Sequence, residues 1–355
     1  MFSGMSPAQH AQRLQNRLKT VGLAGVLALP PRVKRVLAGR PVRREGQTLD
    51  TDTQILLRGM RLLREKGPER FPVPVGRRVL DTQTALVGGR HPIGAVVQRR
   101  LGGRPVRIYV PQTLAGSSED RPTLVFFHGG GFIYGGLASH DAPCRFLAER
   151  AGVQVIAVDY RLAPEHRFPA AYDDCVAAFE HVVAHAEELS VDTARLAVGG
   201  DSAGGNLAAG VALHAARQRL PLAFQLLVYP TTDPAATGGS RETFGHGFYL
   251  TDEFMTLATD SYQPDVSQRS DPRFAPLKAD LPAGLAPAYV VTAGFDPLRD
   301  EGESYVARLR DAGVAVELRR QEGLIHGFLN CVGVGTSGPA AVAEIADRLA
   351  AGVKA

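Results

Sequence analysis

Short apolar segments that alternate with helical ones constrain the fold of this 355-residue chain more than any other feature. Six strand candidates follow one another at residues 123–127, 153–158, 196–199, 224–229, 288–292 and 314–318. Helix candidates lie between most of them or after the last, at about 141–151, 171–188, 203–218, 300–312 and 338–351. Because short apolar strands separated by helices pair in parallel and are covered on both faces, this rhythm predicts an α/β fold with a mostly parallel sheet.

Two more strands are predicted ahead of this series. Residues 95–101 and 104–110 are both strand-like, and Gly102-Gly103 stands between them. A Gly-Gly pair between two such runs is typical of a β-hairpin. With this hairpin we expect an eight-stranded sheet with helices on both faces.

Two segments depart from the rhythm. The first 70 residues show helical spacing of apolar residues, at Leu14, Leu18 and Val21 and again within 54–66, interrupted by prolines and glycines. Residues 232–280 are rich in Pro, Gly, Asp and aromatic residues, and we interpret them as an insertion near the active face. The chain shows no internal repeat or low-complexity segment.

Positive charge is concentrated at the N-terminus. The whole chain carries a net charge of +4, but residues 1–70 hold fourteen Lys and Arg against five acidic residues, so the rest of the chain is net acidic. A basic amphipathic segment of this kind suits contact with an anionic lipid surface, or it is a helical cap with a solvated basic face. No aromatic residues interleave these charges as stacking on bases would require, so we expect no nucleic-acid partner.

Cysteine content and hydropathy bear on the compartment. The three cysteines, Cys144, Cys175 and Cys331, form no CxxC pair, which argues against a zinc site and favours a reducing, cytoplasmic compartment. No apolar run approaches the roughly 18 residues that a transmembrane helix needs. Basic residues before position 21 imitate a signal peptide, but no small-residue cleavage site follows, so we do not expect export.

The sharpest motif is Gly200-Asp201-Ser202-Ala203-Gly204-Gly205. It directly follows one strand candidate and directly precedes a helix candidate. A serine nucleophile must project from a tight, strained strand-to-helix turn, and glycines two residues before and after it leave room for that turn. The following helix also points its positive end at the site. The motif predicts Ser202 as a nucleophile, with an ordinary glycine-rich turn as the alternative.

A second glycine-rich motif, His128-Gly129-Gly130-Gly131-Phe132, follows the strand candidate at 123–127. Acyl transfer builds negative charge on a carbonyl oxygen, and glycines let backbone N–H groups approach that oxygen without a Cβ in the way. We expect the N–H groups of Gly130, Gly131 and Ala203 to form this oxyanion hole. A phosphate-binding loop is the alternative, but neither nucleotide-binding glycine motif occurs in the chain.

A serine nucleophile needs a base, and the base needs an acid that orients it. Asp296 follows the strand candidate at 288–292, and His326 follows the one at 314–318. Both therefore leave the carboxyl edge of the sheet, where the serine turn also opens, and the chain order is serine, acid, histidine. We expect Asp296 and His326 to complete a triad with Ser202.

Together these motifs resemble the hormone-sensitive-lipase-like family of α/β-hydrolase carboxylesterases, also called bacterial family IV. The matching segments are 128–132, 159–166, 200–205, 296–301 and 326–328, which span well over half of the chain. The family commonly has Trp or Phe after the three glycines, and Phe132 fits that pattern.

The resemblance implies Ser202 as nucleophile, His326 as general base and Asp296 as its orienter. The supporting motif residues are His128, Gly129, Gly200, Asp201 and Gly204, and we assign Phe132 and Tyr160 of the same motifs to substrate binding. It further implies a helical cap formed by residues 1–80 and by the insertion at about 232–280, on a catalytic domain of residues 81–355. No cofactor or metal is expected, and a homodimer is compatible with the family.

Three other pairs of residues have a spacing or position that suggests a role. Arg161 and Glu165 are expected to pair with each other beneath the site. His181 and His185 have a spacing that suits a metal, but no third ligand is evident and a surface helix is the better interpretation. Asp300 and Glu301 either support the loop that holds Asp296 or are ordinary acids at a helix N-terminus.

The sequence therefore predicts a serine carboxylesterase that acts on short- to medium-chain esters through an acyl-enzyme. A lipase for longer acyl chains is the nearest alternative. A ligand-binding module on the same fold is the other, and the presence of His326 disfavours it.

Overall fold

The computed structural model of the protein describes residues 19–354. Its centre is an eight-stranded sheet in the order β10-β9-β8-β7-β5-β6-β4-β3. β4 pairs antiparallel with both β3 and β6, and all other neighbours in this sheet are parallel. The strands are β3 Ala95–Leu101, β4 Arg104–Val110, β5 Arg121–Phe127, β6 Gln154–Val158, β7 Val191–Asp201, β8 Phe224–Val228, β9 Ala288–Phe295 and β10 Val316–Ile325. The predicted mostly parallel, eight-stranded sheet is confirmed.

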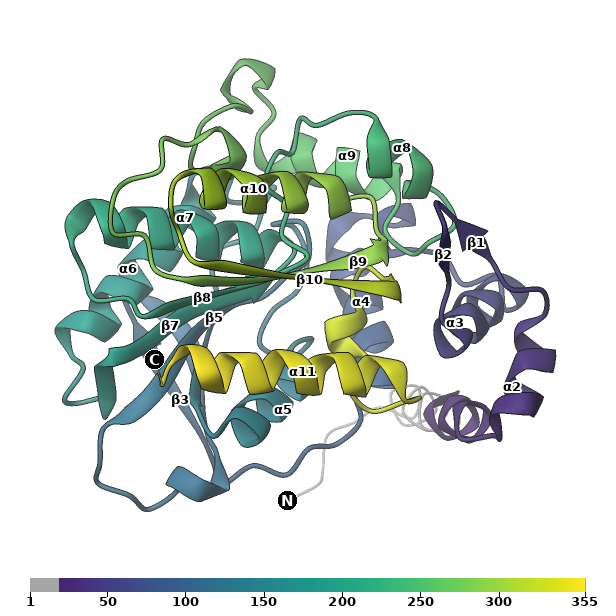
Figure 1. Ribbon diagram of the computed structural model, residues 1–355, viewed down its shortest axis with the longest axis horizontal. Coiled ribbons are helices and arrows are strands. Elements are labelled where there is room, and N and C mark those ends of the chain that lie inside the picture. The colour runs from purple at the N-terminus through teal and green to yellow at the C-terminus, as the bar shows by residue number, and fades with distance from the viewer. Residues whose placement is uncertain (1–18, 355) are drawn as a thin grey trace.

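Helices cover both faces of the sheet. α5 (Asp141–Ala151) and α11 (Ser337–Gly352) lie on one face, and α6 (Ala170–Ala184), α7 (Ala203–Gln218) and α10 (Arg299–Asp311) lie on the other (Figure 1). Side chains of β5 alternate between these layers because successive residues of a strand point to opposite faces. Leu124 and Phe126 belong to the core under α5 and α11, whereas Val125 and Phe127 belong to the core under α6 and α7.

The two C-terminal strands are longer than the sequence predicts. β9 continues to Phe295 and β10 to Ile325, so that each ends directly before Asp296 or His326. β10 is an edge strand whose exposure alternates along much of its length, and its polar, partly exposed residues hide its extent from a hydropathy pattern.

The N-terminal segment folds into small helices and one short hairpin. Residues 19–27 are helical, as expected around Val21, whereas Leu14 and Leu18 lie outside the described residues. The elements that follow are α2 (Pro31–Ala38), β1 (Arg43–Arg44), β2 (Gln47–Thr48), α3 (Thr51–Leu62), the 3-10 turn η1 (Pro68–Arg70) and α4 (Val73–Gly88). α3 begins at Thr51 because Asp50 caps it, with Oδ2 accepting from the backbone N–H of Thr53 at 2.9 Å. The helix expected within 54–66 therefore starts and ends earlier.

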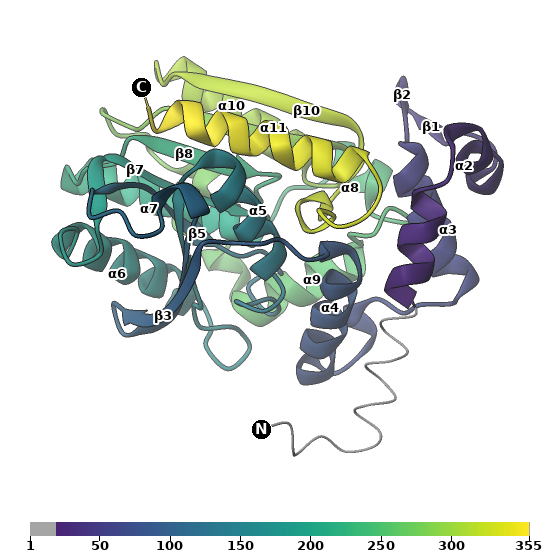
Figure 2. The same ribbon diagram turned by 90° about the horizontal axis from the view of Figure 1, so that it is seen from below.

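The insertion predicted at about 232–280 is also partly helical. It contains α8 (Gly239–Phe244), α9 (Asp252–Tyr262) and the 3-10 turns η3 (Val266–Gln268) and η4 (Pro276–Lys278). Two further 3-10 turns, η2 (Gln112–Leu114) and η5 (Phe328–Asn330), lie outside it. α8 and α9 lie beside the N-terminal helices, at the side of the molecule toward which β9 and β10 point (Figures 1 and 2). We refer to residues 31–88 and 239–278 as the cap.

Specific polar contacts fasten the cap to the sheet domain. Arg77 of α4 donates to the carbonyl oxygens of Ile133 and Ala163, both at 2.9 Å, and pairs with Glu165 at 2.6 Å. The Asp52 carboxylate accepts from the backbone N–H of Thr336 at 2.9 Å, next to the start of α11. Within residues 19–354, no helix combines the length and apolar character that crossing a membrane requires.

Candidate active site

Ser202 occupies the sharp turn between β7 and α7. Its backbone has φ 56° and ψ −119°, a strained conformation for a non-glycine residue. The turn is possible because Gly200 and Gly204 approach β5 closely: a Cβ on either glycine would collide with the carbonyl oxygen of Phe127. The serine side chain is thereby held above the carboxyl edge of the sheet.

Ser202, His326 and Asp296 form one hydrogen-bonded chain. Nε2 of His326 lies 2.9 Å from Oγ of Ser202, and Nδ1 of His326 lies 2.8 Å from Oδ2 of Asp296. In the neutral ring with its proton on Nδ1, the imidazole donates to the carboxylate and accepts the serine proton. Asp296 is fully buried, and its other oxygen accepts from the backbone N–H of Leu298 at 2.8 Å. This geometry is suited to removing a proton from Ser202.

The glycine loop after β5 lies next to this serine. Gly130 and Gly131 have φ values of +120° and +63°, and a Cβ on Gly131 would lie within 2.9 Å of Phe254 and Ala258. Among the described residues, the backbone amides of Gly130, Gly131 and Ala203 have no hydrogen-bond partner. They are free donors at the carboxyl edge of the sheet, which is the arrangement that an oxyanion hole requires.

Asp201 connects the glycine loop to the serine turn. Its Oδ1 accepts from the backbone N–H of Gly129 at 2.8 Å and lies 3.1 Å from Nε2 of His140. Burial works to raise the pKa of Asp201, but the His140 imidazole and the Gly129 amide outweigh it and lower the pKa of this carboxyl. Asp201 thus stays ionised while fully enclosed, and it fixes the start of the glycine loop.

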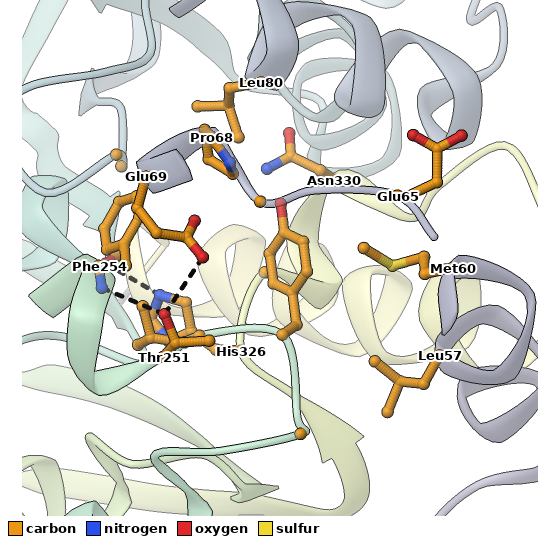
Figure 3. A pocket seen from close by; sticks show the side chains of 18 of the residues that line it. Leu57, Met60, Glu65, Pro68, Glu69, Leu80, Thr251, Phe254, His326 and Asn330 are labelled. Atoms are coloured by element: carbon orange, nitrogen blue, oxygen red, sulfur yellow. Dashed lines mark hydrogen bonds between the residues drawn. The ribbon is translucent and has the colours of Figure 1, made fainter. Parts of the chain in front are cut away.

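A cavity of about 410 Å³ opens over Ser202 and His326. Both parts of the cap contribute to its walls, as Figure 3 shows for Leu57, Met60, Glu69, Thr251 and Phe254. A smaller cavity, about 40 Å³, reaches Ser202 from the side of Phe132 and Met255. A mostly apolar space that encloses a nucleophile is typical of a small-molecule site.

Comparison with known proteins agrees with this geometry. A family model described as the alpha/beta hydrolase fold matches residues 124–330, more than half of the chain. The chain belongs to the α/β-hydrolase family. Its resemblance to the hormone-sensitive-lipase-like esterases of that family, inferred above from the motifs, is confirmed.

Two relatives of this hydrolase are ester hydrolases by name. The chain is 38% identical over 371 residues to carboxylic ester hydrolase LipN of Mycobacterium tuberculosis, covering 97% of this chain and 94% of that one. It is 42% identical over 231 residues to ethyl acetate hydrolase of Pseudomonas putida, covering 63% and 71% of the two chains. The predicted enzyme class, a carboxylic ester hydrolase, is therefore confirmed.

Solved structures agree with these relatives. An α/β-hydrolase enzyme from the metagenome of Lake Arreo superposes with a TM-score of 0.81 at 39% identity, over 85% of this chain and 98% of the other. The hyperthermophilic esterase of Pyrobaculum calidifontis gives a TM-score of 0.79 at 35% identity, over 84% and 97% of the two chains.

Two residues of the hydrolase assigned to substrate binding lie in different surroundings. Phe132 lines the smaller cavity and stacks on Tyr262 with ring centres 4.2 Å apart. Tyr160 lines neither cavity: it is buried, stacks on His128 at 4.2 Å and donates to the carbonyl oxygen of His128 at 2.6 Å. Its assignment to substrate binding is therefore corrected to a support beneath the glycine loop.

His128 belongs to the same support. Nδ1 lies 2.9 Å from the carbonyl oxygen of Gly129, and Nε2 is buried without a partner. Burial, together with the nearby His140, lowers the pKa of His128 to about 3. The His128 ring is consequently neutral at working pH. It packs against Tyr160 and supports the glycine loop through its contact with the carbonyl oxygen of Gly129.

The expected pairing of Arg161 with Glu165 is wrong. Arg161 pairs instead with Asp174 of α6 at 2.7 Å, and Glu165 pairs with Arg77 of the cap. Asp174 receives both the backbone N–H and the guanidinium of Arg161, which leaves Glu165 free to face α4.

The two histidines considered for a metal lie on α6 and just after it. His181 and His185 stack on each other with ring centres 4.0 Å apart, and within residues 19–354 no cluster of three metal-ligating side chains occurs.

The two acids at the start of α10 both contact the insertion. Glu301 accepts from the hydroxyl of Thr231 at 2.9 Å and from the backbone N–H of Thr232 at 2.7 Å. The carboxyl that supports the start of the insertion is therefore Glu301, and Asp300 holds α8 by accepting from the N–H of Ser240 at 2.8 Å.

Sequence reasoning missed the residues that the cap supplies. Glu69, Tyr249 and Phe254 line the cavity but belong to no motif, and His140 also lines it from the loop before α5. The one available signal was the composition of the insertion, which placed it near the active face without naming residues.

Proposed function

We propose that this hydrolase cleaves short- to medium-chain carboxylic esters through an acyl-enzyme on Ser202. The observation that carries the proposal is the hydrogen-bonded chain Ser202–His326–Asp296 at the floor of the 410 Å³ cavity. The relative named ethyl acetate hydrolase acts, by its name, on a short ester, which supports this substrate class.

Each group has a defined part in the proposed reaction. His326 takes the proton of Ser202 as Oγ attacks the ester carbonyl, and Asp296 holds the ring and stabilises the imidazolium. The amides of Gly130, Gly131 and Ala203 receive the oxyanion. His326 then protonates the leaving alcohol, and a water molecule activated by the same ring hydrolyses the acyl-enzyme.

The proposal extends to the cap and the compartment. We assign residues 1–80 and 232–280 to a cap over the acyl site and 81–355 to the catalytic domain, with α4 crossing that boundary as far as Gly88.

The compartment and the oligomeric state are also part of the proposal. Cys144, Cys175 and Cys331 are all free thiols, which supports a reducing, cytoplasmic compartment. β10 is an edge strand of the sheet, which supports pairing of two copies of the chain there.

A fluorophosphonate experiment tests the nucleophile. Intact mass followed by peptide mapping is expected to show one adduct, on Ser202, and Ser202→Ala is expected to lower kcat by at least roughly 10⁴-fold. Ser304→Ala, a serine on the exposed side of α10, is the matched control and keeps the parent rate. Labelling elsewhere, or a Ser202→Ala enzyme with the parent rate, would refute the assignment.

The pH profile tests the base. A general base must be unprotonated to accept the serine proton, so activity is expected to fall as the solution is acidified. Full activity at about pH 4 would exclude His326 as the base.

A further inference from the structure

Helix α2 of the cap presents apolar side chains to the outside. Val33, Val36 and Leu37 are 43%, 79% and 42% exposed, and their spacing places them in one stripe along the helix. The residues that α2 buries are Lys34 and Ala38, and the Lys34 ammonium is neutralised by Asp52. The helix thus turns a lysine inward and an apolar stripe outward, the reverse of a normal surface helix.

Exposed apolar side chains are concentrated in the N-terminal part of the described chain. Of the eight large apolar side chains that are exposed within residues 19–354, six lie before residue 64. They are Val21, Val33, Val36, Leu37, Leu62 and Leu63. A contiguous exposed apolar stripe, such as the one along α2, is typical of an interaction site, whereas single exposed apolar residues are not.

Unneutralised positive charge lies on α2 itself and in the segment that follows it. The arginines between residues 31 and 50 are exposed and, in the described part of the chain, take part in no ion pair; they are Arg32, Arg35, Arg40, Arg43 and Arg44. The two acidic residues of this stretch are already engaged. Glu45 pairs with Arg299, and Asp50 accepts from Thr53 and from Ser337.

We propose that the outward face of α2 docks on an anionic lipid surface. The stripe Val33, Val36 and Leu37 enters the boundary between headgroups and acyl chains, and the flanking arginines bind lipid phosphates. A second copy of the chain fits this face less well, because a two-fold interface would set the same five arginines against each other. The phosphates of a nucleic acid would bind the arginines, but a nucleic acid would leave the apolar stripe exposed.

The docked face belongs to the same cap as the mouth of the cavity. Arg61 and Arg64 line the cavity, and Leu62 and Leu63 between them are 74% and 68% exposed. α3, which carries Arg61 and Leu62, packs against α2. If the protein acts as proposed above, an apolar ester dissolved in the lipid surface would enter from this side; lipid docking itself does not depend on that activity.

Single-tryptophan variants test the docking directly, because the chain contains no Trp. In the full-length protein, Val36→Trp is compared with Val266→Trp, whose parent valine is similarly exposed (71%) but lies in the η3 turn. With vesicles of phosphatidylcholine containing about a third phosphatidylglycerol, the emission of Val36→Trp is expected to shift to shorter wavelength. Val266→Trp is expected to stay unchanged. Equal shifts in both, or none in Val36→Trp, would overturn the proposal.

Vesicle co-sedimentation separates the apolar from the charged contribution. Val36→Glu is expected to bind the same vesicles at least roughly tenfold more weakly than the parent. The double variant with Arg32→Gln and Arg35→Gln is expected to bind about 25-fold more weakly, because each arginine contributes about fivefold to the affinity. Val266→Glu and Arg99→Gln are the controls and should bind like the parent. All variants should hydrolyse a soluble 4-nitrophenyl ester at the parent rate, which shows that they are folded.

Two results would contradict lipid docking. One is a parent protein that fails to bind anionic vesicles at low salt, or that binds vesicles of phosphatidylcholine alone equally well. The other is a parent dimer in solution that Val36→Glu converts to a monomer without vesicle binding, which would assign the stripe to a second copy of the chain.

Discussion

Asp201, the residue before Ser202, carries a prediction at the scale of a single side chain. Asp201→Ala leaves the buried N–H of Gly129 without its acceptor, so we expect the free energy of unfolding to fall by about 1–3 kcal/mol and kcat to fall with it. Asp201→Asn keeps an acceptor oxygen for the Gly129 N–H but removes the negative charge beside His140, so its losses should be clearly smaller than those of Asp201→Ala. Urea unfolding and kcat for 4-nitrophenyl acetate measure both effects. Equal losses in the two variants would show that the hydrogen bond to Gly129 is unimportant.

Glu69 carries a second prediction at this scale. Its carboxylate faces the cavity and accepts only a long hydrogen bond, 3.5 Å, from Thr251, with no ion pair among the described residues (Figure 3). A negative charge beside the substrate should favour esters that carry an ammonium group over those that carry a carboxylate. Glu69→Gln is expected to reduce that preference in kcat/KM by about fivefold, because about 1 kcal/mol is typical of one partly solvated charge pair.

The control for Glu69 is a glutamate on the outer surface of the cap. Glu242 lies on α8 and lines neither cavity, so Glu242→Gln should leave the preference unchanged. Neutral esters of equal size should have the same kcat/KM in the parent, in Glu69→Gln and in Glu242→Gln. A preference that persists in Glu69→Gln would assign the selectivity to other groups.

At the scale of secondary structure elements, Glu301 of α10 links the sheet domain to the insertion. Burial raises the pKa of Glu301 from 4.5 to about 7, although hydrogen bonds from residues 231–233 oppose the shift. A raised pKa means that the folded state holds the proton more tightly than the unfolded state. The corresponding stability is complete below about pH 4.5 and is lost as the pH rises to about 7, with a total of about 3 kcal/mol.

Glu301→Gln tests this pH dependence. The amide has no proton to lose and its oxygen can still accept from Thr231 and Thr232, so the variant should lack the loss of stability between pH 4.5 and 7. Urea unfolding at several pH values measures the difference between the two curves. Glu119→Gln, at an exposed turn, should follow the parent curve. Parallel curves for parent and Glu301→Gln would refute the linkage.

The elements that the sequence predicted well are those with local signals. The strands Ala95–Leu101 and Arg104–Val110 were placed to the residue, because Gly102 and Gly103, with φ of 53° and 78°, make the turn that their sequence suggests. The family resemblance implied that the insertion is helical, but α8 and α9 were not located within it, because their helical stretches are short and lie among Pro and Gly. Their stability comes from packing on the sheet domain and the cap, which a sequence window does not contain.

At the scale of the whole molecule, chain topology explains which part of the site was predictable. Parallel strands end at one edge of the sheet, so the residues after β7, β9 and β10 had to converge, and the structure brings Ser202, Asp296 and His326 together. No such topological rule places the residues that line the cavity wall. Met60 and Phe254 line opposite sides of the cavity from segments far apart in the chain (Figure 3), and only the docking of the cap sets their positions.

The depth of this cap-built cavity should limit the length of the ester. Met60 lies on the cavity wall away from His326, the histidine that contacts Ser202 (Figure 3), so Met60→Trp is expected to reduce kcat/KM for 4-nitrophenyl octanoate by roughly tenfold while leaving the acetate ester nearly unchanged. The larger ring occupies space that only a longer substrate needs. Because the chain has no other Trp, quenching of this residue by a bound product also reports cavity occupancy directly. Equal losses for both esters would place the length limit elsewhere, and undiminished activity on emulsified long-chain esters would favour a lipase.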